Sequence, residues 1–500
     1  MSEGKVTKKG KALYDYQLED IKRIFTCYDK NEPSYNLLYQ LPTGGGKTVI
    51  FSEIARQFIE KTGKKVLILT HRIELSRQTS GMLQEFGVHN KVINSQVKEL
   101  PDQNKFQCFV AMVETLNNRL QDDKWKLENL GLVIIDEAHY NSFVKLLKYF
   151  VECRILGVTA TPLSSNVNIR MKDHYKELIT GYGIPNLIEK GFLAKATTYS
   201  YEVGLGSLKV GINGDYTVKS SQELYTNEEM RSKLLYAYEQ RAKNKKTLIF
   251  NNGIDTSKFV YETFRNAKYD IRHLDNTNTK KQREEILQWF HTKPNAIITS
   301  VGILTTGFDE PSIETIILNR ATRSLALYFQ MVGRGSRIYK DKKTFDIIDL
   351  GNNAARFGLW SNEVDWQKIF RNPSYFLENI ISDSDIEKLF KYIMPDEIRS
   401  EFPNTEELEF DVKTTYDNVL KVGKKSQEVI DLAIEHHAKM LLDNSEDLAE
   451  ALRKFRLLDE SIKDIVRRFS YCIANSTRNF RDWLIDDFKT KLRKIILSEF

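Results

Sequence analysis

Short runs of apolar residues alternate along the chain with longer segments in which apolar residues recur at helical spacing. Between residues 35 and 160 these runs are YNLLYQ, VLILT, CFVAMV, LVIID and ILGVT, and the pattern starts again after residue 246 with TLIF, AIITS, TIIL and FDIIDL. Uninterrupted apolar runs separated by helical segments are typical of parallel sheets that are buried on both faces. The sequence therefore predicts two α/β domains in tandem.

The domain boundaries follow from changes in this pattern. The segment GYGIPNLIEKGFLAKATTY at 181–199 is punctuated by glycine and predicts a crossing between domains near residue 195. After about residue 362 the strand signals fade, and segments such as DIEKLFKYI and DLAEALRKFRLL carry apolar residues at helical spacing. We therefore expect α/β domains at 1–195 and 196–365 and a mainly α-helical region at 366–500.

Composition limits the class of protein. The chain has 500 residues, 41% of them hydrophobic, which is enough to bury about three cores of ordinary size. Its net charge of +6 is compatible with a localised phosphate-binding track. The four cysteines are widely spaced and argue against a disulfide framework or a structural zinc. A polar N-terminus and the lack of an uncharged apolar run of spanning length lead us to expect a soluble, cytoplasmic protein without a membrane partner.

A glycine-rich loop, LPTGGGKT at 41–48, joins a predicted strand to a predicted helix. Glycines let the backbone amides of such a loop turn toward phosphate oxygens, and the following helix adds the positive end of its dipole. Lys47 is placed to bind the β and γ phosphates of a nucleotide, and Thr48 to bind magnesium. The loop departs from the strict pattern, because Leu41 stands where the first glycine is expected.

A pair of acids follows another predicted strand, in LVIIDEAH at 132–139. The carboxyl ends of parallel strands form the edge at which such sheets bind ligands. Asp136 would hold magnesium directly or through water, while Glu137 would orient or deprotonate an attacking water. Either motif alone could be a glycine turn or a charged strand end, but together they indicate an enzyme that uses ATP and Mg²⁺.

The chain resembles the DEAH-type superfamily 2 helicases over about residues 10–360. The matching motifs stand in the family's order: YDYQ at 14–17, LPTGGGKT, THRIEL at 70–75, VETL at 113–116, DEAH, TATP at 159–162, TTGFDEP at 305–311 and QMVGRGSR at 330–337. The resemblance implies an α/β fold of two tandem RecA-like P-loop domains, with ATP in the cleft between them and nucleic acid across both.

The same resemblance implies roles for residues in these motifs. Gln17 would read the adenine edge, and the nucleotide would be bound by Gln17, Thr43, Gly44, Gly45, Gly46, Lys47, Thr48, Gly307 and Asp309. Magnesium would be held by Thr48 and Asp136. Contacts with nucleic acid, or coupling of those contacts to the state of the ATP, are expected from His71, Arg72, Thr115, His139, Thr159, Thr161 and Thr305.

The second domain is expected to complete the catalytic site. Gln330, Arg334 and Arg337 lie at i, i+4 and i+7, so a helix would present all three on one face. By resemblance, Arg334 and Arg337 are the candidates to stabilise charge that develops on the γ phosphate, which would make hydrolysis depend on domain closure. The catalytic set is then Lys47, Asp136, Glu137, Gln330, Arg334 and Arg337.

Details of the motifs favour DNA as the polymer. THRIEL, DEAH, TATP and QMVGRGSR differ from the set typical of DEAD-box RNA helicases and are similar to the DNA-handling branch that contains restriction-enzyme motor subunits. The stretch RATRSLALYFQMVGRGSR, followed by TFDIIDLGNNAARFGL, is similar to RadD-like repair helicases, although the tail lacks their cysteine-rich zinc element. We therefore expect an ATP-dependent DNA helicase or translocase.

Two alternatives stay open, an RNA helicase and a nucleic-acid-binding motor or scaffold subunit of a larger repair or anti-phage defence complex. The helical tail could also bind a protein partner. Its basic residues could line a channel for a nucleic acid strand, or they could cover a solvated helix face, which the interleaved acids favour. These basic residues are Arg467, Arg468, Arg478, Arg481 and Lys489.

Overall fold

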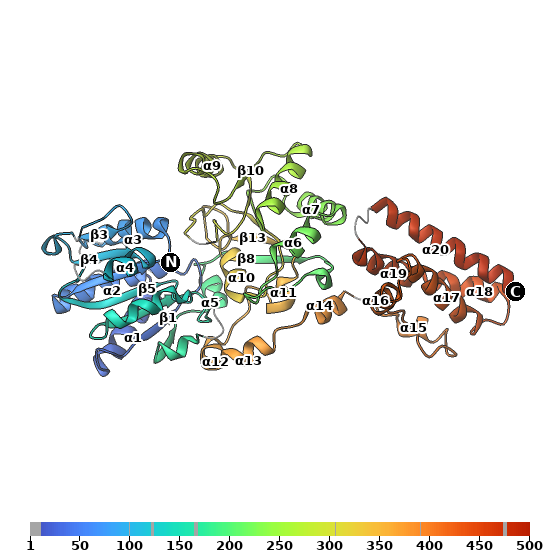
Figure 1. Cartoon of the computed structure of the whole chain (residues 1–500), viewed down its shortest axis with the longest axis horizontal. Helices are drawn as coiled ribbons and strands as arrows, with labels where there is room; N and C mark the ends of the chain where they lie inside the picture. The colour runs from blue at the N-terminus through green and yellow to red at the C-terminus, as the bar shows by residue number, and fades with distance from the viewer. Residues whose placement is uncertain are drawn as a thin grey trace.

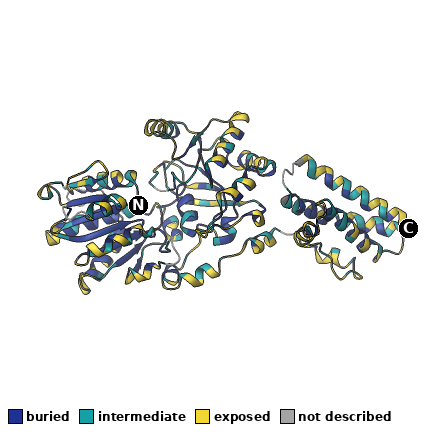
Figure 2. Cartoon of the chain, in the orientation of Figure 1, coloured by how far each residue is buried: buried dark blue, intermediate teal, exposed yellow. Residues whose placement is uncertain are grey.

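The structure is a computed structural model, and it describes residues 12–99, 101–121, 125–164, 169–305, 307–390, 392–473 and 478–500. Three parts follow one another along the chain: two domains built on parallel sheets, and a bundle of helices that holds the C-terminus (Figure 1). The strands are mostly buried, whereas the helices expose one side to solvent (Figure 2). One apolar core runs from the first α/β domain into the second.

The first sheet has seven strands, and all neighbouring strands run parallel. Their order across the sheet is β3 (Asn90–Ile93), β4 (Cys108–Met112), β2 (Lys65–Thr70), β5 (Leu130–Asp136), β6 (Arg154–Thr159), β1 (Leu37–Gln40) and β7 (Glu177–Thr180). The predicted apolar runs form the interior strands. The edge strands β3 and β7 contain exposed positions, so the hydrophobic pattern does not reveal them.

Helices connect these strands and position the loops of interest. α1 (Asp15–Lys30) precedes β1, and the later helices are α2 (Lys47–Thr62), α3 (Ile73–Glu85), α4 (Val113–Leu120) and α5 (Ile184–Glu189). Three 3-10 segments complete the domain: η1 (Gln103–Lys105), η2 (Asn141–Tyr149) and η3 (Met171–Asp173). α3 and α4 begin just after β2 and β4, and α2 follows β1 after the loop of residues 41–46, so the N-termini of the three helices gather at one edge of the sheet.

The second sheet has six strands, again all parallel. Their order is β10 (Ile271–Leu274), β11 (Ile297–Ser300), β9 (Thr247–Asn251), β12 (Thr315–Asn319), β13 (Thr344–Asp349) and β8 (Lys195–Ser200). The accompanying helices are η4 (Leu205–Ser207), α6 (Val218–Tyr225), α7 (Glu228–Arg241), α8 (Ile254–Asn266), α9 (Lys280–Thr292), α10 (Leu325–Val332) and α11 (Asn353–Phe357). The sheet begins at residue 195, where β8 pairs with β13.

The stretch expected to be one helical region divides in two. α12 (Trp366–Arg371) and α13 (Pro373–Glu378) return to the first α/β domain, where the Gln367 side-chain amide donates to the Leu178 carbonyl at 2.8 Å and Lys172 Nζ donates to the Arg371 carbonyl at 2.8 Å. α14 (Asp383–Leu389) packs on the second domain. The apolar side of α12, which includes the buried Trp366, needs a partner surface, and the α/β domains provide it.

A separate helical core starts near residue 394. It is formed by α15 (Asp396–Arg399), α16 (Val412–Lys421), α17 (Glu428–Leu442), α18 (Leu448–Leu457), α19 (Asp459–Cys472) and α20 (Arg478–Glu499). No helix within the described ranges is long and apolar enough to cross a membrane.

Four of the five basic residues considered for a channel pair with carboxylates. Arg467 and Arg481 reach the second α/β domain, where they pair with Glu202 at 3.0 Å and Glu229 at 3.2 Å. Within the bundle, Arg468 pairs with Asp464 at 2.8 Å and Lys489 pairs with Asp459. The side chain of Arg478 lies outside the described part of the chain.

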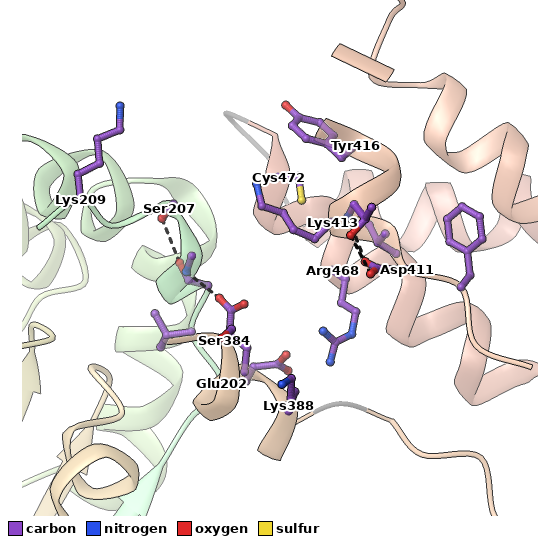
Figure 3. A pocket seen from close by; sticks show the side chains of 17 residues that line it. Glu202, Ser207, Lys209, Ser384, Lys388, Asp411, Lys413, Tyr416, Arg468 and Cys472 are labelled. Atoms are coloured by element: carbon purple, nitrogen blue, oxygen red, sulfur yellow. Dashed lines mark hydrogen bonds between the residues drawn. The ribbon is translucent and has the colours of Figure 1, made fainter. Parts of the chain in front are cut away.

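A groove of about 710 Å³ separates the bundle from the second domain (Figure 3). Arg468 extends from the bundle toward Glu202 on the opposite side. Burial raises the pKa of the Glu202 and Glu387 carboxyls, and the charge of Arg468 opposes part of this effect at both. Because acids and bases face each other here, the described residues that line the groove form no continuous basic surface of the kind that follows a phosphate backbone. Of the two alternatives for the basic residues of the tail, this arrangement gives no support to the strand-binding channel.

Candidate active site

The glycine loop between β1 and α2 has the conformation that a phosphate cradle requires. Gly44 and Gly46 have φ of +87° and +88°, a backbone region that residues with a Cβ rarely adopt. A Cβ on Gly45 would lie 2.8 Å from Leu41 Cγ. Leu41 is fully buried at the position where the strict pattern has glycine, and its side chain packs against the loop at Gly45. The departure from the pattern therefore leaves the cradle intact.

Lys47 stands at the first position of α2, where the dipole of the helix is positive. Its Nζ donates to the Leu41 carbonyl at 3.3 Å. Burial lowers the pKa of Lys47, although the nearby carboxylates of Glu137 and Asp136 oppose this shift. An anion bound at the helix N-terminus would contact both the amides of the loop and this ammonium group.

The two acids at the end of β5 adopt a strained turn. Glu137 has φ of +52°, which is uncommon for any residue other than glycine. Its backbone amide donates to Asp136 Oδ1 at 3.0 Å, and the Ala138 amide then donates to the Val158 carbonyl of β6 at 2.9 Å. The turn points the two carboxyl groups toward the glycine loop and carries His139 toward β6.

These carboxyl groups fit a divalent cation. Burial and the neighbouring Glu137 carboxylate raise the pKa of Asp136, because two negative charges share a site that has little water. Glu137 Oε2 is buried with His139 Nδ1 3.4 Å away, and no described group hydrogen-bonds to it. Within the described ranges no cluster of three or more His, Cys, Asp or Glu side chains could hold a metal on its own. Mg²⁺ would therefore need Asp136, the hydroxyl of Thr48 in the first turn of α2, and oxygens from a nucleotide and water.

His139 joins the two α/β domains. Its Nδ1 lies 3.0 Å from Thr159 Oγ1, and its Nε2 lies 3.1 Å from Gln330 Nε2 of the second domain. The Thr159 hydroxyl donates to the Thr161 carbonyl at 3.0 Å, so it accepts a hydrogen from His139. Burial lowers the pKa of His139, so the ring is neutral, with its proton on Nδ1 and the Nε2 lone pair facing the Gln330 amide. One chain of hydrogen bonds thus runs from the turn after β6 to α10.

The three residues expected on one helix face do not share a helix. α10 ends at Val332, before Arg334 and Arg337. Two glycines follow within the sequence GRGS, and a Cβ on Gly335 would lie 2.4 Å from the Phe345 ring. Because glycine is a poor helix former and the chain must pass close to this ring, the helix stops and a loop carries the arginines. The prediction of a continuous helix at this position was wrong.

The two arginines are held by the loop that follows β11. Arg334 is buried, and it donates through Nε and Nη2 to the Thr305 carbonyl at 3.0 and 2.6 Å and through Nη1 to the Phe308 carbonyl at 2.7 Å. Arg337 donates to the Phe308 carbonyl at 3.3 Å and pairs with the exposed Asp309 carboxylate at 2.5 Å. Arg337 is therefore held less firmly than Arg334.

Residues 333–337, which we call the arginine loop, pack against the glycine loop of the first domain. A Cβ on Gly333 would lie 2.7 Å from Thr43 Cβ, and a Cβ on Gly44 would lie 3.2 Å from Ser336 Oγ. The charges of Arg334 and Arg337 are close enough to lower the pKa of Lys47. The structure thus brings all six members of the expected catalytic set to one interface between domains.

The residues expected to contact nucleic acid are only partly free to do so. Arg72 crosses to the second domain, where it donates to the Ile303 and Gly302 carbonyls at 3.0 and 3.3 Å. Next to it, Glu74 pairs with Arg283 of α9 at 3.0 Å. A nucleic acid that contacts Arg72 would therefore have to displace the second domain or share this guanidinium with it.

Other members of this set lie along the same edge. His71 Nδ1 bonds Ser142 Oγ at 3.0 Å. The Thr305 hydroxyl donates to the Gly302 carbonyl at 2.6 Å, and Thr115 is half-buried in the first turn of α4. The Thr161 hydroxyl is buried, and no described group hydrogen-bonds to it. Gly307, which was expected to bind the nucleotide, faces α3 across the interface, because a Cβ at this position would lie 3.4 Å from Leu75.

Gln17 lies against the glycine loop rather than in open space. Its Oε1 accepts from the Tyr14 backbone amide at 3.0 Å, and a Cβ on Gly46 would lie 2.5 Å from its Nε2. The neighbouring Tyr16 hydroxyl donates to the Gly45 carbonyl at 2.7 Å, a contact that the sequence did not indicate. A tyrosine before this glutamine has no distinguishing spacing, so only the fold reveals its contact with the loop.

Two family models match parts of the chain. Residues 10–164 match the model described as type III restriction enzyme, res subunit, and residues 228–339 match the model described as helicase conserved C-terminal domain. The chain is 30% identical, over 359 residues and 67% of its length, to the Saccharomyces cerevisiae protein named "Putative ATP-dependent helicase IRC3". The match covers 51% of that protein, so the chain spans about half the length of this relative.

Solved structures show the same architecture. A fragment described as a "putative HsdR subunit of a type I restriction enzyme from Vibrio vulnificus YJ016" is 21% identical with a TM-score of 0.55, and the match covers 68% of this chain and 64% of the fragment. The "ATP-dependent Type ISP restriction-modification enzyme LlaBIII bound to DNA" is 16% identical with a TM-score of 0.52, and the match covers 99% of this chain and 40% of that one. These likenesses confirm the predicted fold class, two parallel α/β domains followed by a helical region.

Proposed function

Because this chain belongs to the superfamily 2 helicases, on the branch of the restriction-enzyme motor subunits, we propose that it hydrolyses ATP between its two RecA-like domains in order to move along or remodel DNA. The observation that carries this proposal is the interface at which the glycine loop, Asp136 and Glu137 of the first domain meet Arg334 and Arg337 of the second. A site divided between two domains links each hydrolysis event to their relative movement.

In the proposed mechanism the first domain binds the nucleotide. The amides of residues 43–48 and the ammonium group of Lys47 bind the phosphates, while the Gln17 side chain packs against the glycine loop at Gly46. Thr48 and Asp136 would hold Mg²⁺, and the ion would supply positive charge that offsets the negative charge of the phosphates. Glu137 orients the attacking water through its Oε2, which has no hydrogen bond from the described residues, and accepts a proton from it.

The second domain contributes the remaining charge. Arg337 has one exposed carboxylate and one carbonyl as partners, so it can exchange them for the γ phosphate. Arg334 has three bonds to buried carbonyls, and its role is to hold the loop that carries Asp309. The hydrogen bonds from Gln330 through His139 to Thr159 couple the position of the second domain to the conformation of the nucleotide site.

The preference for DNA rests on the relatives as well as on the motifs. The res-subunit model covers the first domain, and a structural relative that spans the whole chain is described as bound to DNA. Arg72 and Thr305, on facing loops of the two domains, would contact the sugar-phosphate backbone. Binding of this kind is independent of sequence and weakens as salt is added.

Steady-state ATP hydrolysis with single-stranded DNA, duplex DNA or RNA tests this proposal. We expect DNA to raise kcat by about tenfold or more, which corresponds to roughly 1.4 kcal/mol of barrier. Stronger stimulation by RNA would replace DNA with RNA as the substrate. If no polymer changed the rate, a scaffold subunit that depends on a partner would become the better interpretation.

Gln330→Leu is expected to lower DNA-stimulated turnover about threefold to tenfold, because it removes one hydrogen bond across the interface, worth roughly 0.5–1.5 kcal/mol. Hydrolysis without DNA should change less, since the groups around the phosphates remain. Gln288→Leu on the exposed side of α9 is the matched control. Equal losses in the two variants, or equal losses with and without DNA, would argue against a coupling role for Gln330.

A further inference from the structure

Lys342 makes an unusual set of contacts next to the arginine loop. Its Nζ donates to three backbone carbonyls, those of Pro311 at 2.9 Å, Gly335 at 2.7 Å and Arg337 at 2.8 Å. A lysine ammonium group has three N–H donors, so these contacts use all of them. Two of the carbonyls belong to the arginine loop, and the third lies at the end of the loop that carries Asp309.

The backbone of Lys342 is itself firmly placed. Its amide donates to the Tyr339 carbonyl at 2.8 Å, which closes a tight turn, and two residues later the chain enters β13. β13 is an interior strand that pairs with β12 on one side and β8 on the other. The Lys342 side chain therefore connects the arginine loop and the loop that carries Asp309 to a backbone position fixed by the second sheet.

The backbone of the arginine loop also contacts the segment before β8, where the Ala194 amide donates to the Ser336 carbonyl at 2.7 Å and Leu193 forms an isolated bridge with Arg337. Lys342 adds contacts from the second sheet, and the composition of the loop makes them useful. Residues 333–337 contain two glycines, which makes an ordered loop entropically expensive. The loop lies beyond the end of α10, so helical hydrogen bonds do not hold Arg337. Among the described residues, the partners of the Arg337 guanidinium are one carbonyl and an exposed carboxylate, so its position depends on where the backbone of residue 337 is fixed.

We propose that Lys342 is a positioning residue for ATP hydrolysis, which holds the backbone of the arginine loop so that Arg337 can reach the γ phosphate. The inference rests on the proposed function of Arg337 and adds a residue outside the recognised motifs. A lysine suits this position, because its compact ammonium group can point hydrogens at three diverging carbonyls, whereas the planar guanidinium of arginine cannot.

The charges around Lys342 make its contribution depend on pH. Arg337, Glu314 and Glu310 are the charged groups that act on its ammonium. Burial and the Arg337 charge lower the pKa of Lys342 to about 8 against the opposite effect of the two carboxylates. Only the protonated form donates all three hydrogen bonds, so the tie is complete below this pKa and weakens as the pH rises through it.

The test compares Lys342→Met and Lys342→Arg with Lys343→Met, a control at the exposed neighbouring position. We expect Lys342→Met to lower kcat roughly tenfold to a hundredfold, because a displaced catalytic group is costly, and to leave the affinity for a fluorescent ATP analogue unchanged. Lys342→Arg should keep an intermediate kcat and lose the decline of kcat above about pH 8, because a guanidinium stays protonated. Lys343→Met should behave as the wild type.

A double-mutant cycle separates positioning from general stability. If Lys342 acts through Arg337, Lys342→Met should lower kcat by less than about twofold in the Arg337→Ala background, because the group it positions is gone. An equal loss in both backgrounds, or an unchanged kcat in Lys342→Met, would overturn the proposal. If Lys342→Met fails to fold, the same cycle is run with Lys342→Arg, together with its pH profile.

A second readout does not need turnover. Hydrogen exchange of the amides in residues 333–337 should become faster in Lys342→Met than in Lys343→Met, because the loop opens more often. If the wild type hydrolyses no ATP under any condition, the proposed function fails, while faster exchange would still show that Lys342 orders the loop. Unchanged exchange would overturn the positioning role whatever the activity of the protein.

Discussion

Glu137→Gln is expected to reduce ATP turnover about a thousandfold, within the range usual for loss of a general base. The substitution keeps the size of the side chain but removes the negative charge that orients water and accepts its proton. Glu137 Oε2 is buried and receives no hydrogen bond from any described group, so an amide there meets no new protein partner. Steady-state hydrolysis with and without DNA measures the effect, and equilibrium binding of a fluorescent ATP analogue should remain within a few-fold of the wild type.

Glu152→Gln is the matched control, because Glu152 is exposed in the turn before β6. A Glu137→Gln variant that kept more than about a tenth of the wild-type turnover would contradict general-base catalysis, which typically contributes at least about a hundredfold. Equal loss of binding and turnover would instead indicate that Glu137 supports the shape of the site. The left-handed backbone conformation and its strain remain in Glu137→Gln, so such a loss would come from the side chain and not from release of backbone strain.

Arg337→Ala is expected to lower kcat roughly a thousandfold, the lower end of the range for an arginine that stabilises phosphoryl transfer. The affinity for ATP should change little, because Lys47 and the glycine loop bind the phosphates from the other domain. Arg334→Ala should also lower kcat, but it should reduce thermal stability as well, because three hydrogen bonds to buried carbonyls are lost. Turnover and melting temperature measured together therefore distinguish the two arginines.

Arg265→Ala on the exposed side of α8 provides the control for loss of a surface ion pair. A milder effect of Arg337→Ala than of Arg334→Ala on kcat, at equal thermal stability, would assign the phosphate contact to Arg334. If both variants kept wild-type turnover, hydrolysis would not depend on charge from the second domain. The proposed link between closure and catalysis would then fail.

The hydrophobic pattern predicts the interior of the fold well because interior strands of parallel sheets are apolar throughout. LVIID and FDIIDL correspond to β5 and β13 nearly to the residue. The pattern does not predict strands at sheet edges, because one side of each contacts solvent, as in NKVI of β3. The domain ranges remain predictions, although the second sheet begins at residue 195.

The positions of candidate site residues were predictable where a motif fixes a backbone conformation, and their roles remain predictions. LPTGGGKT specifies a loop that only glycines can form, so the motif alone predicts where Lys47 stands relative to a bound phosphate. The helix expected to carry Arg334 was wrong because the local spacing takes no account of the Phe345 ring, which passes too close to Gly335. Lys342 lies outside every motif, and its role follows only from three carbonyls that converge in space.

The return of α12 to the first domain has a consequence for how the enzyme can open. The chain passes from the first domain to the second once near residue 194, and α12 brings it back to contact Leu178 and Lys172. Two attachment points define a single rotation axis, whereas one linker would permit twisting and sliding. Opening of the cleft should therefore approximate a one-dimensional rotation, in which displacement grows with distance from the line that joins the two crossings. Severing the α12 contacts would add degrees of freedom to this opening and weaken the link between domain closure and hydrolysis that we propose.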